Sequence, residues 1–525
     1  MVSFRLVVAC AALALAACAS LPSEHSTAPS TALTGTADTK LGVLAVRALA
    51  TLKEPSGVHL LYQGPDAFLA RLALADAAER SIDAQYYIWH NDTTGRLLLA
   101  WLLRAADRGV RVRILIDDVG SAANDMNLLL MTAHPKVEVR LFNPIASRSA
   151  RLMGLLFDFS RTNRRMHNKS FTVDNQVAIV GGRNIGDEYF GARQDVNFGD
   201  LDSLTVGAAV ADVSGRFDAF WNSSVVYAIQ DLTTTRPDAA AYAKAREELE
   251  AFARQERDGE YAEALRNNEL AQQLLAGRVA FSGGSVKVLA DDPAKVERPD
   301  EDRSKNLMPQ LMPELAGMRE QVLMVSPYFV PGVDGVETLR RLRARGIRVR
   351  VLTNSLASTD EPSVYSGYAK YRDALLEAGV ELYELNPDAT RDELRRRRDA
   401  GDDDKTHGSG RSRAALHAKT LVVDCRIFFV GSMNLDPRSA LTNTEIGIVV
   451  DAPEAVVRLC SVLDDVLAKG AYRVELRSSA TGGMHAEWVG REGDREVRYS
   501  VEPKSTAWQR WKSGFYSLLP IEPLL

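Results

Sequence analysis

The chain has 525 residues, of which 46% are hydrophobic and 25% are charged, and its formal net charge is −5. Ordinary composition excludes a generally disordered chain, and the length is too great for one simple core, so two domains are expected. The acidic balance argues against a dedicated polynucleotide-binding protein, which normally carries a strong basic excess.

The N-terminus reads as a secretion signal. An apolar run follows Arg5 and ends in small residues directly before Cys18. The run is too short to span a bilayer and is typical of a signal peptide, here residues 1–17. The small residues before Cys18 resemble a bacterial lipoprotein box, which implies cleavage before Cys18 and acylation of its thiol. A plain signal peptide with an incidental cysteine is the alternative.

Residues 18–42 are predicted to be the lipidated cysteine and a flexible tether, because Ser, Thr, Ala and Pro dominate there and offer little to bury. We therefore expect a protein of the bacterial cell envelope, lipid-anchored to a membrane and facing the periplasm. Cys425 and Cys460 would lie in a compartment where disulfides form, and the sequence leaves open whether they pair.

The body of the chain contains the same pattern twice. In the first half, residues 43–230, a strand at 81–89, a helix at 95–107 and a strand at 110–116 predict a parallel β-α-β unit, followed by a strand at 137–142. The second half, residues 291–470, repeats the pattern with a strand at 322–329, a helix at 335–344 and a strand at 347–353. A repeat of this length predicts a duplicated domain.

Two further segments complete the predicted organisation. Residues 231–290 are rich in Ala, Glu and Arg with helical periodicity and are expected to be a helical connector. Residues 471–525 are expected to be a C-terminal extension with short antiparallel strands. Trp508, Trp511 and Phe515 near its end could lie at a lipid interface, although ordinary packing explains them as well.

The most informative feature is a motif that occurs in both halves. His167, Lys169 and Asp174 recur as His417, Lys419 and Asp424 with identical spacing. In both copies a pair of small residues then precedes an Asn, and Asn184 stands at the same offset from His167 as Asn434 does from His417. A single His-x-Lys carries no weight, but two copies that agree at every one of these positions are not a coincidence.

The motif residues suit one chemistry. His and Lys two positions apart on a strand share a face, and the Asn after the next turn can reach back toward them. Two copies facing each other would surround a tetrahedral anion with one imidazole on either side. In-line displacement at phosphorus through a covalent intermediate requires a nucleophile, an acid for the leaving oxygen, and fixed cations between them.

These residues resemble the phospholipase D superfamily, whose signature is the doubled His-x-Lys-x4-Asp, over essentially residues 60–525. Within it the chain is most similar to bacterial cardiolipin synthases of the type-C branch, through the stretches 83–89, 326–331, 352–355 and 515–520. The resemblance implies an α/β fold: two duplicated α-β-α domains with mostly parallel mixed sheets and the active site at their interface.

The resemblance also implies roles for the catalytic side chains. His167 would be the nucleophile, and His417 would protonate the departing alcohol and then act as base for the incoming one. The resemblance places four side chains on the phosphoryl oxygens: Lys169, Lys419, Asn184 and Asn434.

The family orients each His through an acidic residue. Glu445, which follows His417 in the second half, fits its own half well. Asp200 is the candidate for His167 in the first half, where it stands at a longer offset that needs a longer loop, and Asp202 is its competitor. The aspartates of the catalytic signature, Asp174 and Asp424, are expected to brace the turn after each strand. No metal or cofactor is implied.

The implied function is phosphatidyl transfer by a membrane-tethered enzyme that makes cardiolipin from phospholipids through a phosphohistidine. Phosphatidylglycerol is the expected lipid partner, with phosphatidylethanolamine as a further candidate donor, a membrane surface as the setting, and no nucleic acid; a helper protein is left open. A hydrolytic phospholipase D that releases phosphatidic acid is the close alternative, and a phosphodiesterase acting on nucleic acid or a non-catalytic lipid-binding module is a more distant one.

Two segments near the motifs invite hypotheses. The apolar stretch 151–157 could admit acyl chains or be a buried core segment. The segment 391–413, with its run of arginines, is predicted to be a loop near the mouth of the site, where it could contact an anionic head group or be a plain insertion.

Overall fold

A computed structural model gives the fold. It describes residues 21–22, 28–121, 125–146, 148, 151, 155, 158–256, 268–297, 303–389, 413–478, 483–492 and 495–525. No helix within these ranges is long and apolar enough to cross a bilayer. The predicted signal peptide, Cys18 and nearly all of the 391–413 loop lie outside the described residues, as does most of the 151–157 stretch.

The first half is built on a mixed sheet with the spatial strand order β9-β4-β3-β2-β5-β6-β8-β1. The strands are β1 (Ser56–Leu61), β2 (Ser81–Tyr86), β3 (Arg111–Asp117), β4 (Val137–Phe142), β5 (Ser170–Val173), β6 (Val177–Gly181), β8 (Asp202–Gly207) and β9 (Val226–Ala228). Parallel pairing is confined to β2, β3 and β4, and the flanking strands pair antiparallel.

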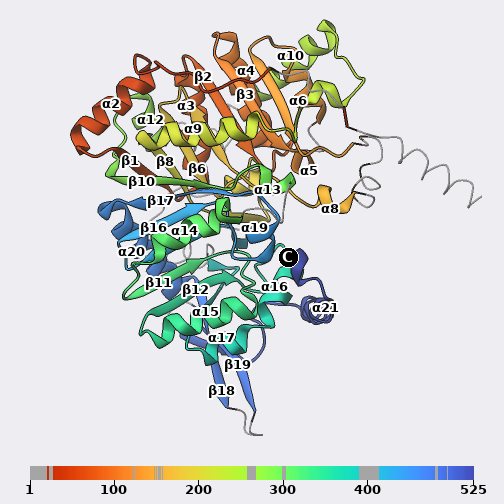
Figure 1. Cartoon of the computed structure of the whole chain (residues 1–525). Helices are drawn as coiled ribbons and strands as arrows, with labels where there is room; N and C mark the ends of the chain where they lie inside the picture. Colours follow the sequence, from red (N-terminus) through yellow and green to blue (C-terminus); the bar gives the residue numbers. More distant parts are fainter. Residues whose placement is uncertain are drawn as a thin grey trace, which may run out of the picture.

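Helices cover both faces of this sheet (Figure 1). On one face lie α3 (Gly64–Ala77) and α4 (Thr93–Asp107), and on the other lies α9 (Ala208–Trp221). Helix α4 begins where the Asp92 carboxylate accepts the backbone N–H of Gly95 at 3.0 Å, and it ends before Gly109, whose φ of 96° suits glycine. The predicted β-α-β unit is therefore present, with boundaries close to the expected ones.

The second half repeats the arrangement with the order β10-β17-β16-β15-β11-β12-β13-β18. Its strands are β10 (Ser282–Ala290), β11 (Gln321–Val325), β12 (Arg348–Asn354), β13 (Glu381–Leu385), β15 (Thr420–Val423), β16 (Ile427–Gly431), β17 (Ile446–Asp451) and β18 (Ala471–Ser478). Helices α14 (Leu307–Leu315), α15 (Gly332–Ala344) and α17 (Arg372–Glu377) contact this sheet, as does α20 (Pro453–Lys469). The duplicated α/β fold is confirmed.

The two sheets meet edge to edge. Strand β1 pairs antiparallel with β10, with Ser56 opposite Gly284. Helices α9 and α20 contribute to a shared apolar core at this seam, which includes Val210, Val213, Val456 and Leu459. A second connection forms away from the seam, where β7 (Val196–Gly199) of the first half pairs in parallel with β14 (Arg413–Leu416) of the second.

The connector is only partly helical. Helices α10 (Ala239–Glu256) and α12 (Glu269–Leu275) agree with the prediction for residues 231–290. The segment then ends in β10, which belongs to the second sheet. The helical periodicity belongs to the Ala- and Glu-rich part of the connector and does not extend to the Gly-Gly-Ser-Val-Lys-Val segment of β10.

Residues 28–42 are docked rather than flexible. Guanidinium groups from the first sheet donate to carbonyls of this segment: Arg113 to Ser30 at 2.9 Å, Arg111 to Thr31 at 2.8 Å, and Arg140 to Ala28 at 2.9 Å. The segment then enters α2 (Lys40–Leu52), whose N-cap is Thr39. The prediction of a flexible tether is wrong for this part because composition does not reveal backbone carbonyls bound by distant arginines.

The C-terminal extension is antiparallel, as predicted. Strand β18 pairs with β19 (Met484–Glu492), which pairs with β20 (Arg495–Tyr499), and β18 also continues the second sheet beside β13. The chain closes with α21 (Ala507–Ser517) and the short η5 (Glu522–Leu524).

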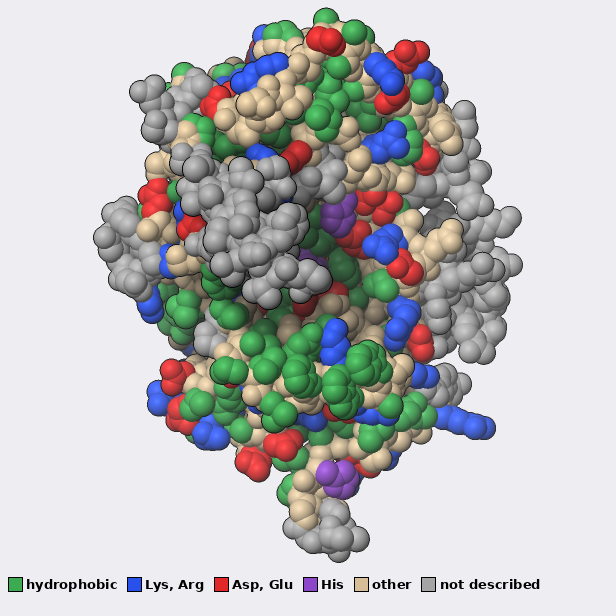
Figure 2. Space-filling model, turned by 90° about the vertical axis from the view of Figure 1, so that its right-hand side faces the viewer, with side chains coloured by type: hydrophobic (Ala, Val, Ile, Leu, Met, Phe, Trp, Pro, Cys, Tyr) green, Lys and Arg blue, Asp and Glu red, His purple; other side chains and the backbone are tan. Residues whose placement is uncertain are grey.

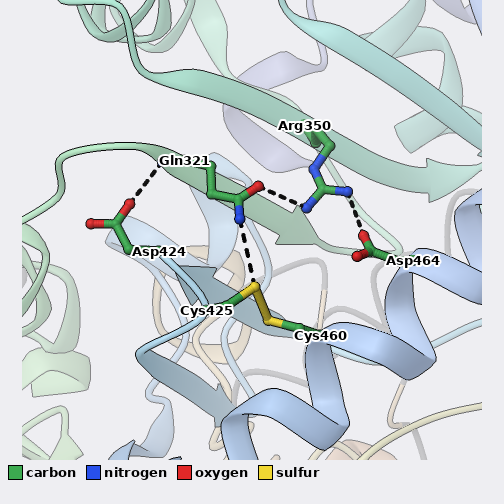
Figure 3. Close-up of a disulfide and its surroundings, with 6 residues drawn as sticks. All are labelled: Gln321, Arg350, Asp424, Cys425, Cys460 and Asp464. Atoms are coloured by element: carbon green, nitrogen blue, oxygen red, sulfur yellow. Dashed lines mark hydrogen bonds and ion pairs between the residues drawn. A yellow bond between two sulfur atoms is a disulfide. The ribbon is translucent and has the colours of Figure 1, made fainter.

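Cys425 and Cys460 form a disulfide with a Cα–Cα distance of 6.0 Å (Figure 3). The bond ties the turn between β15 and β16 to helix α20. Gln321 lies beside it, with its amide nitrogen 3.6 Å from the Cys425 sulfur, and accepts a hydrogen bond from Arg350 at 3.0 Å.

Candidate active site

The two motif histidines lie where the halves exchange backbone hydrogen bonds. The N–H of His167 donates to the carbonyl of Thr444 at 2.9 Å, and the N–H of His417 donates to the carbonyl of Gly199 at 2.8 Å. Both rings are buried, with 8% and 6% of each residue exposed. Each histidine is thus held by the half to which it does not belong.

The orienting carboxylates are exchanged in the same way. Nδ1 of His167 lies 2.9 Å from a carboxylate oxygen of Glu445, and Nδ1 of His417 lies 2.6 Å from one of Asp200. The prediction that each acid serves the histidine of its own half is wrong. The reason is that Asp200 directly follows β7, which pairs with the strand leading into His417, while Glu445 directly follows Thr444, which bonds His167.

Glu445 is held by a buried hydrogen-bond network. The hydroxyls of Ser432 and Ser439 donate to its two carboxylate oxygens, the second at 2.8 Å. Its backbone N–H donates to Asp291 at 2.7 Å, and Asp291 also accepts from the Lys295 ammonium at 3.0 Å. Burial raises the pKa of Glu445 to about 7, although Lys169 and both serine hydroxyls oppose the shift.

Asp200 packs more closely against the neighbouring backbone than Glu445 does. A Cβ atom on Gly182 would lie 2.2 Å from its Oδ1, so only glycine fits there. Ser432, the second-half counterpart of Gly182, instead donates to the longer Glu445. Burial alone would raise the pKa of Asp200, but the charge and hydrogen bond of His417 lower it overall, with Lys419 and Arg183 contributing. The competitor Asp202 pairs with Arg71 at 2.9 Å.

The two motif lysines are buried beside their histidines. The ammonium of Lys169 donates to the carbonyl of His167 at 2.7 Å, and that of Lys419 donates to the carbonyl of His417. Burial lowers the pKa of Lys169 to about 7 and that of Lys419 to about 8, while Glu445 and Asp200 respectively oppose these shifts most strongly. Both lysines would regain a full charge beside a bound anion.

The pKa values of the histidines are lowered as well, but unequally. Burial, followed by the charges of Lys169 and Lys419, holds the pKa of His167 well below its usual value. Burial and Lys419 also lower the pKa of His417, but the Asp200 carboxylate raises it in opposition. His417 therefore keeps a proton more readily than His167 does.

The two asparagines differ in their partners. The Asn184 side chain accepts from the N–H of Ile88 at 3.1 Å and donates to the Tyr189 hydroxyl at 2.9 Å. The Asn434 side-chain oxygen is buried and, among the described residues, has no hydrogen-bond partner. Asn434 is thus the freer amide, whereas Asn184 is already braced by protein groups.

Aromatic rings enclose both imidazoles. Tyr87 contacts the His167 ring edge-on at a centroid distance of 5.1 Å. Tyr189 contacts the His417 ring edge-on at 5.1 Å, and Phe198 stacks on it at 5.2 Å. These rings pack against the imidazoles and restrict their motion.

The signature aspartates brace the backbone, as predicted for them, and do so away from the imidazoles. Asp174 accepts the N–H groups of Glu79, Arg80 and Ser81, at the start of β2. Asp424 accepts those of residues 319–321 at 2.7–2.8 Å, at the start of β11. Both aspartates have positive φ in the tight β5–β6 and β15–β16 turns. Asp174 and Asp424 belong to the catalytic signature in the sequence, but their role in the structure is to support the backbone.

One group in the described part of the chain has metal-ligand chemistry: His90, Asp92 and Glu188. Its members already have protein partners. Asp92 caps α4 and accepts the N–H of Asp187 at 2.8 Å, and His90 lies 3.2 Å from Glu188.

Sequence reasoning missed several residues that position the site. Asp117, at the end of β3, accepts the N–H of Val119 at 2.9 Å and also that of Met166, next to His167, at 2.8 Å. Asp291, Lys295 and Ser439 stand behind Glu445 and gave no signal, because they have no counterpart in the first motif. Ser432 could have been found, since it differs from Gly182 at the same offset.

Two histidines, each backed by a carboxylate, with two lysines and an amide converging between duplicated domains, define a phospholipase-D-type phosphotransfer site. The family model described as "Cardiolipin synthase, PLD-like domain" matches residues 72–221 and 311–466. The chain is 40% identical over 475 residues to cardiolipin synthase C of Escherichia coli K12, covering 89% of this chain and 96% of that relative. It therefore belongs to the cardiolipin synthase family of phospholipase-D-like enzymes.

Two other proteins also match most of the chain. An uncharacterized protein of Helicobacter pylori 26695 is 33% identical over 432 residues, covering 81% of this chain and 82% of that protein. The crystal structure of phosphatidylserine synthase from Haemophilus influenzae covers 92% of this chain and 100% of its own, with a TM-score of 0.56 and 14% identity. At that identity the likeness concerns the fold.

Proposed function

We propose that this chain is a phosphatidyltransferase that joins a phosphatidyl group to a second phospholipid and so makes cardiolipin. The observation that carries the proposal is the pair of crossed dyads, His167–Glu445 and His417–Asp200, at the domain interface. The name of the Escherichia coli relative supports cardiolipin as the product.

In the first step, Nε2 of His167 attacks the phosphorus of the donor lipid, and the bond from phosphorus to the head-group oxygen breaks. His417 gives its proton to that oxygen, so the head-group alcohol leaves neutral. The lowered pKa of His167 favours a free lone pair for attack, and the Asp200 carboxylate favours a proton on His417. Glu445, on Nδ1 of His167, keeps the attacking nitrogen in the right tautomer.

In the second step, the hydroxyl of phosphatidylglycerol gives its proton to His417 and attacks the phosphohistidine. The phosphorus–nitrogen bond breaks, and His167 returns as a neutral imidazole. Lys169, Lys419 and Asn434 hold the non-bridging oxygens, and each such contact is worth about 3 kcal/mol in the transition state. Asn184 contributes to the site by holding Tyr189 and Ile88 in place through its hydrogen bonds.

Water at the same phosphohistidine would give phosphatidic acid, so exclusion of water separates transfer from hydrolysis. The aromatic rings of Tyr87, Tyr189 and Phe198 against the imidazoles support transfer. The Cys425–Cys460 disulfide supports the envelope setting, facing the periplasm and anchored through Cys18, since disulfides persist in oxidising compartments.

The test uses the full chain in mixed micelles with labelled phosphatidylglycerol, with and without phosphatidylethanolamine. Products are resolved by mass spectrometry, and His167→Ala is assayed in parallel. Cardiolipin that disappears with the variant is the expected result, and its dependence on phosphatidylethanolamine would name the donor. Phosphatidic acid as the sole product would make the enzyme a hydrolase, and no lipid product would overturn the proposal.

A further inference from the structure

The C-terminal helix α21 carries its aromatic residues on the outside. Trp508, Trp511, Phe515 and Leu518 recur at helical spacing and are 65%, 59%, 48% and 82% exposed. The rings form a continuous stack, with centroids 4.8 Å apart between Trp508 and Trp511 and 5.9 Å apart between Trp511 and Phe515. Large aromatic side chains are seldom left this exposed in a row.

The opposite face of α21 is small and polar, and that face packs inward. Helix α21 lies against α16 (Pro362–Ala369). Arg510, Ser513 and Ser517 line a cavity of about 300 Å³ between the two helices. Ser513 is buried, and Arg510 donates to the carbonyl of Ser505 at 2.8 Å. The apolar face of α21 therefore points away from the protein and its polar face points inward, the reverse of a helix that packs on its own core. Such a helix is stabilised when its outer face contacts an apolar medium.

The start of the helix is capped, and the chain beyond its end is bonded to the second half. A capping box begins it, in which Thr506 and Gln509 bond each other's backbone N–H groups. Beyond its end, the carbonyl of Leu525 accepts the N–H of Arg438 at 2.8 Å. Arg438 precedes Ser439, which donates to Glu445. The end of the chain that carries the aromatic row is thus bonded beside the residue that supports Glu445.

The charges on α21 have one sign. The helix contains Arg510 and Lys512 and no acidic residue. Lys512 lies 5.5 Å from the Tyr516 ring centroid and acts electrostatically on Glu361. Next to Glu361, Asp360 accepts a hydrogen bond from the Tyr328 hydroxyl at 2.8 Å. The carbonyl of Tyr328 accepts the N–H of Leu435, beside the phosphate-site candidate Asn434, so Tyr328 connects the neighbourhood of Lys512 to that of the site.

We propose that α21 docks the enzyme on an anionic phospholipid bilayer, with its aromatic row in the interfacial region and Lys512 near the lipid head groups. Aromatic residues favour membrane interfaces, and cations favour anionic lipid. The face of the molecule that bears α21 shows hydrophobic side chains gathered below a hollow in which histidine is visible (Figures 1 and 2). The proposal deepens the proposed function and rests on it, because docking there would present the hollow to lipid head groups.

The first experiment measures contact directly. The full chain is mixed with phosphatidylglycerol vesicles that carry brominated acyl chains, which quench tryptophan only on contact. Trp89, Trp221 and Trp488 are fully buried, so quenching should come from α21. We expect quenching that disappears in the double variant Trp508→Phe/Trp511→Phe and persists in Trp101→Phe. Quenching that survives the double variant, or that is absent from the wild type, would overturn the proposal.

The second experiment separates docking from chemistry. In a chain that carries Cys18→Ser and so lacks the proposed acyl anchor, replacing Trp508, Trp511 and Phe515 with Ser should weaken binding to phosphatidylglycerol vesicles by about 100-fold or more, because three aromatic side chains lose their apolar contact. The matched control places Ser at Val46, Leu275 and Val457, which are 56%, 63% and 62% exposed elsewhere, and should bind normally. Because the replaced residues are exposed, both variants should keep the melting temperature of the wild type.

Turnover measurements distinguish a failure of the docking proposal from a failure of the proposed function. With monomeric short-chain phosphatidylglycerol, the triple variant should match the wild type, while with vesicles its apparent KM should rise. Vesicle binding through α21 without any cardiolipin would leave docking intact and refute the proposed function. The wild type could instead form a dimer that the triple substitution dissociates and that does not bind vesicles. That result would show that this face binds a second copy of the chain, and it would refute docking on a membrane.

Discussion

The crossed dyads can be tested by replacing one carboxylate at a time with the corresponding amide. This substitution removes the charge and keeps the size of the side chain. In Asp200→Asn the 2.6 Å contact to Nδ1 of His417 loses its ionic character. A buried hydrogen bond to a charged group is worth about 1.5–3 kcal/mol, which corresponds to a slowing of about 10- to 150-fold. Glu445→Gln should slow the reaction comparably, but by acting on His167.

The identity of the leaving group distinguishes the two effects. A phosphatidyl ester of p-nitrophenol needs no proton to leave at neutral pH, so it bypasses the general acid and not the nucleophile. We expect this substrate to restore release of p-nitrophenol by Asp200→Asn and His417→Ala. It should not restore release by Glu445→Gln or His167→Ala. Stopped-flow absorbance gives the rate of the first step.

The controls keep the test specific. Asp195→Asn makes the same chemical change at an exposed residue directly before β7, and should have no effect. Melting temperatures verify that each variant is folded. If the pairing within each half were correct, Glu445→Gln would be rescued and Asp200→Asn would not, and that pattern would refute the reasoning.

Three further predictions follow from the same site and its scaffold. Binding of short-chain phosphatidylglycerol to His167→Asn should weaken as pH rises through about 7 to 8, because Lys169 and Lys419 are charged only below those pKa values; calorimetry that shows constant affinity from pH 6 to 9 would contradict this. Gly182→Ser, which copies Ser432, should slow turnover as much as Asp200→Asn, since its Cβ would displace Asp200, while Ser432→Gly should cost less; a fully active Gly182→Ser would show that the fit is loose. Replacing both disulfide cysteines with Ser should lower the unfolding free energy by about 4 kcal/mol, given their sequence separation of 35, measured by urea denaturation, and an unchanged midpoint would show that the bond is not formed in solution.

Local patterns were enough to predict the repeat and the motif residues. The spacing of His167, Lys169 and Asn184 recurs because each copy is one hairpin with one turn, and such a unit keeps its offsets when it is duplicated. The scaffolding role of Asp424 also follows from local geometry, since it lies in a tight turn with positive φ.

The partners of the histidines could not be predicted in the same way. Asp200 and Glu445 each follow the motif histidine of their own half, Asp200 at the longer offset, and spacing alone is compatible with pairing inside each half. The actual pairing depends on β7 joining β14, two strands that lie in different halves of the sequence. Contacts of that kind depend on how two finished domains dock, which no window of sequence contains.

The exchange of carboxylates makes each half depend on the other. A half on its own has a histidine without its acid and an acid without its histidine, and a buried carboxylate with no partner is costly. Docking along β1–β10 and β7–β14 satisfies both carboxylates at once and creates the phosphate site in the same step. Formation of the inter-domain interface and formation of the catalytic centre are thus the same event, and any mutation that opens the seam should remove activity before it unfolds either half.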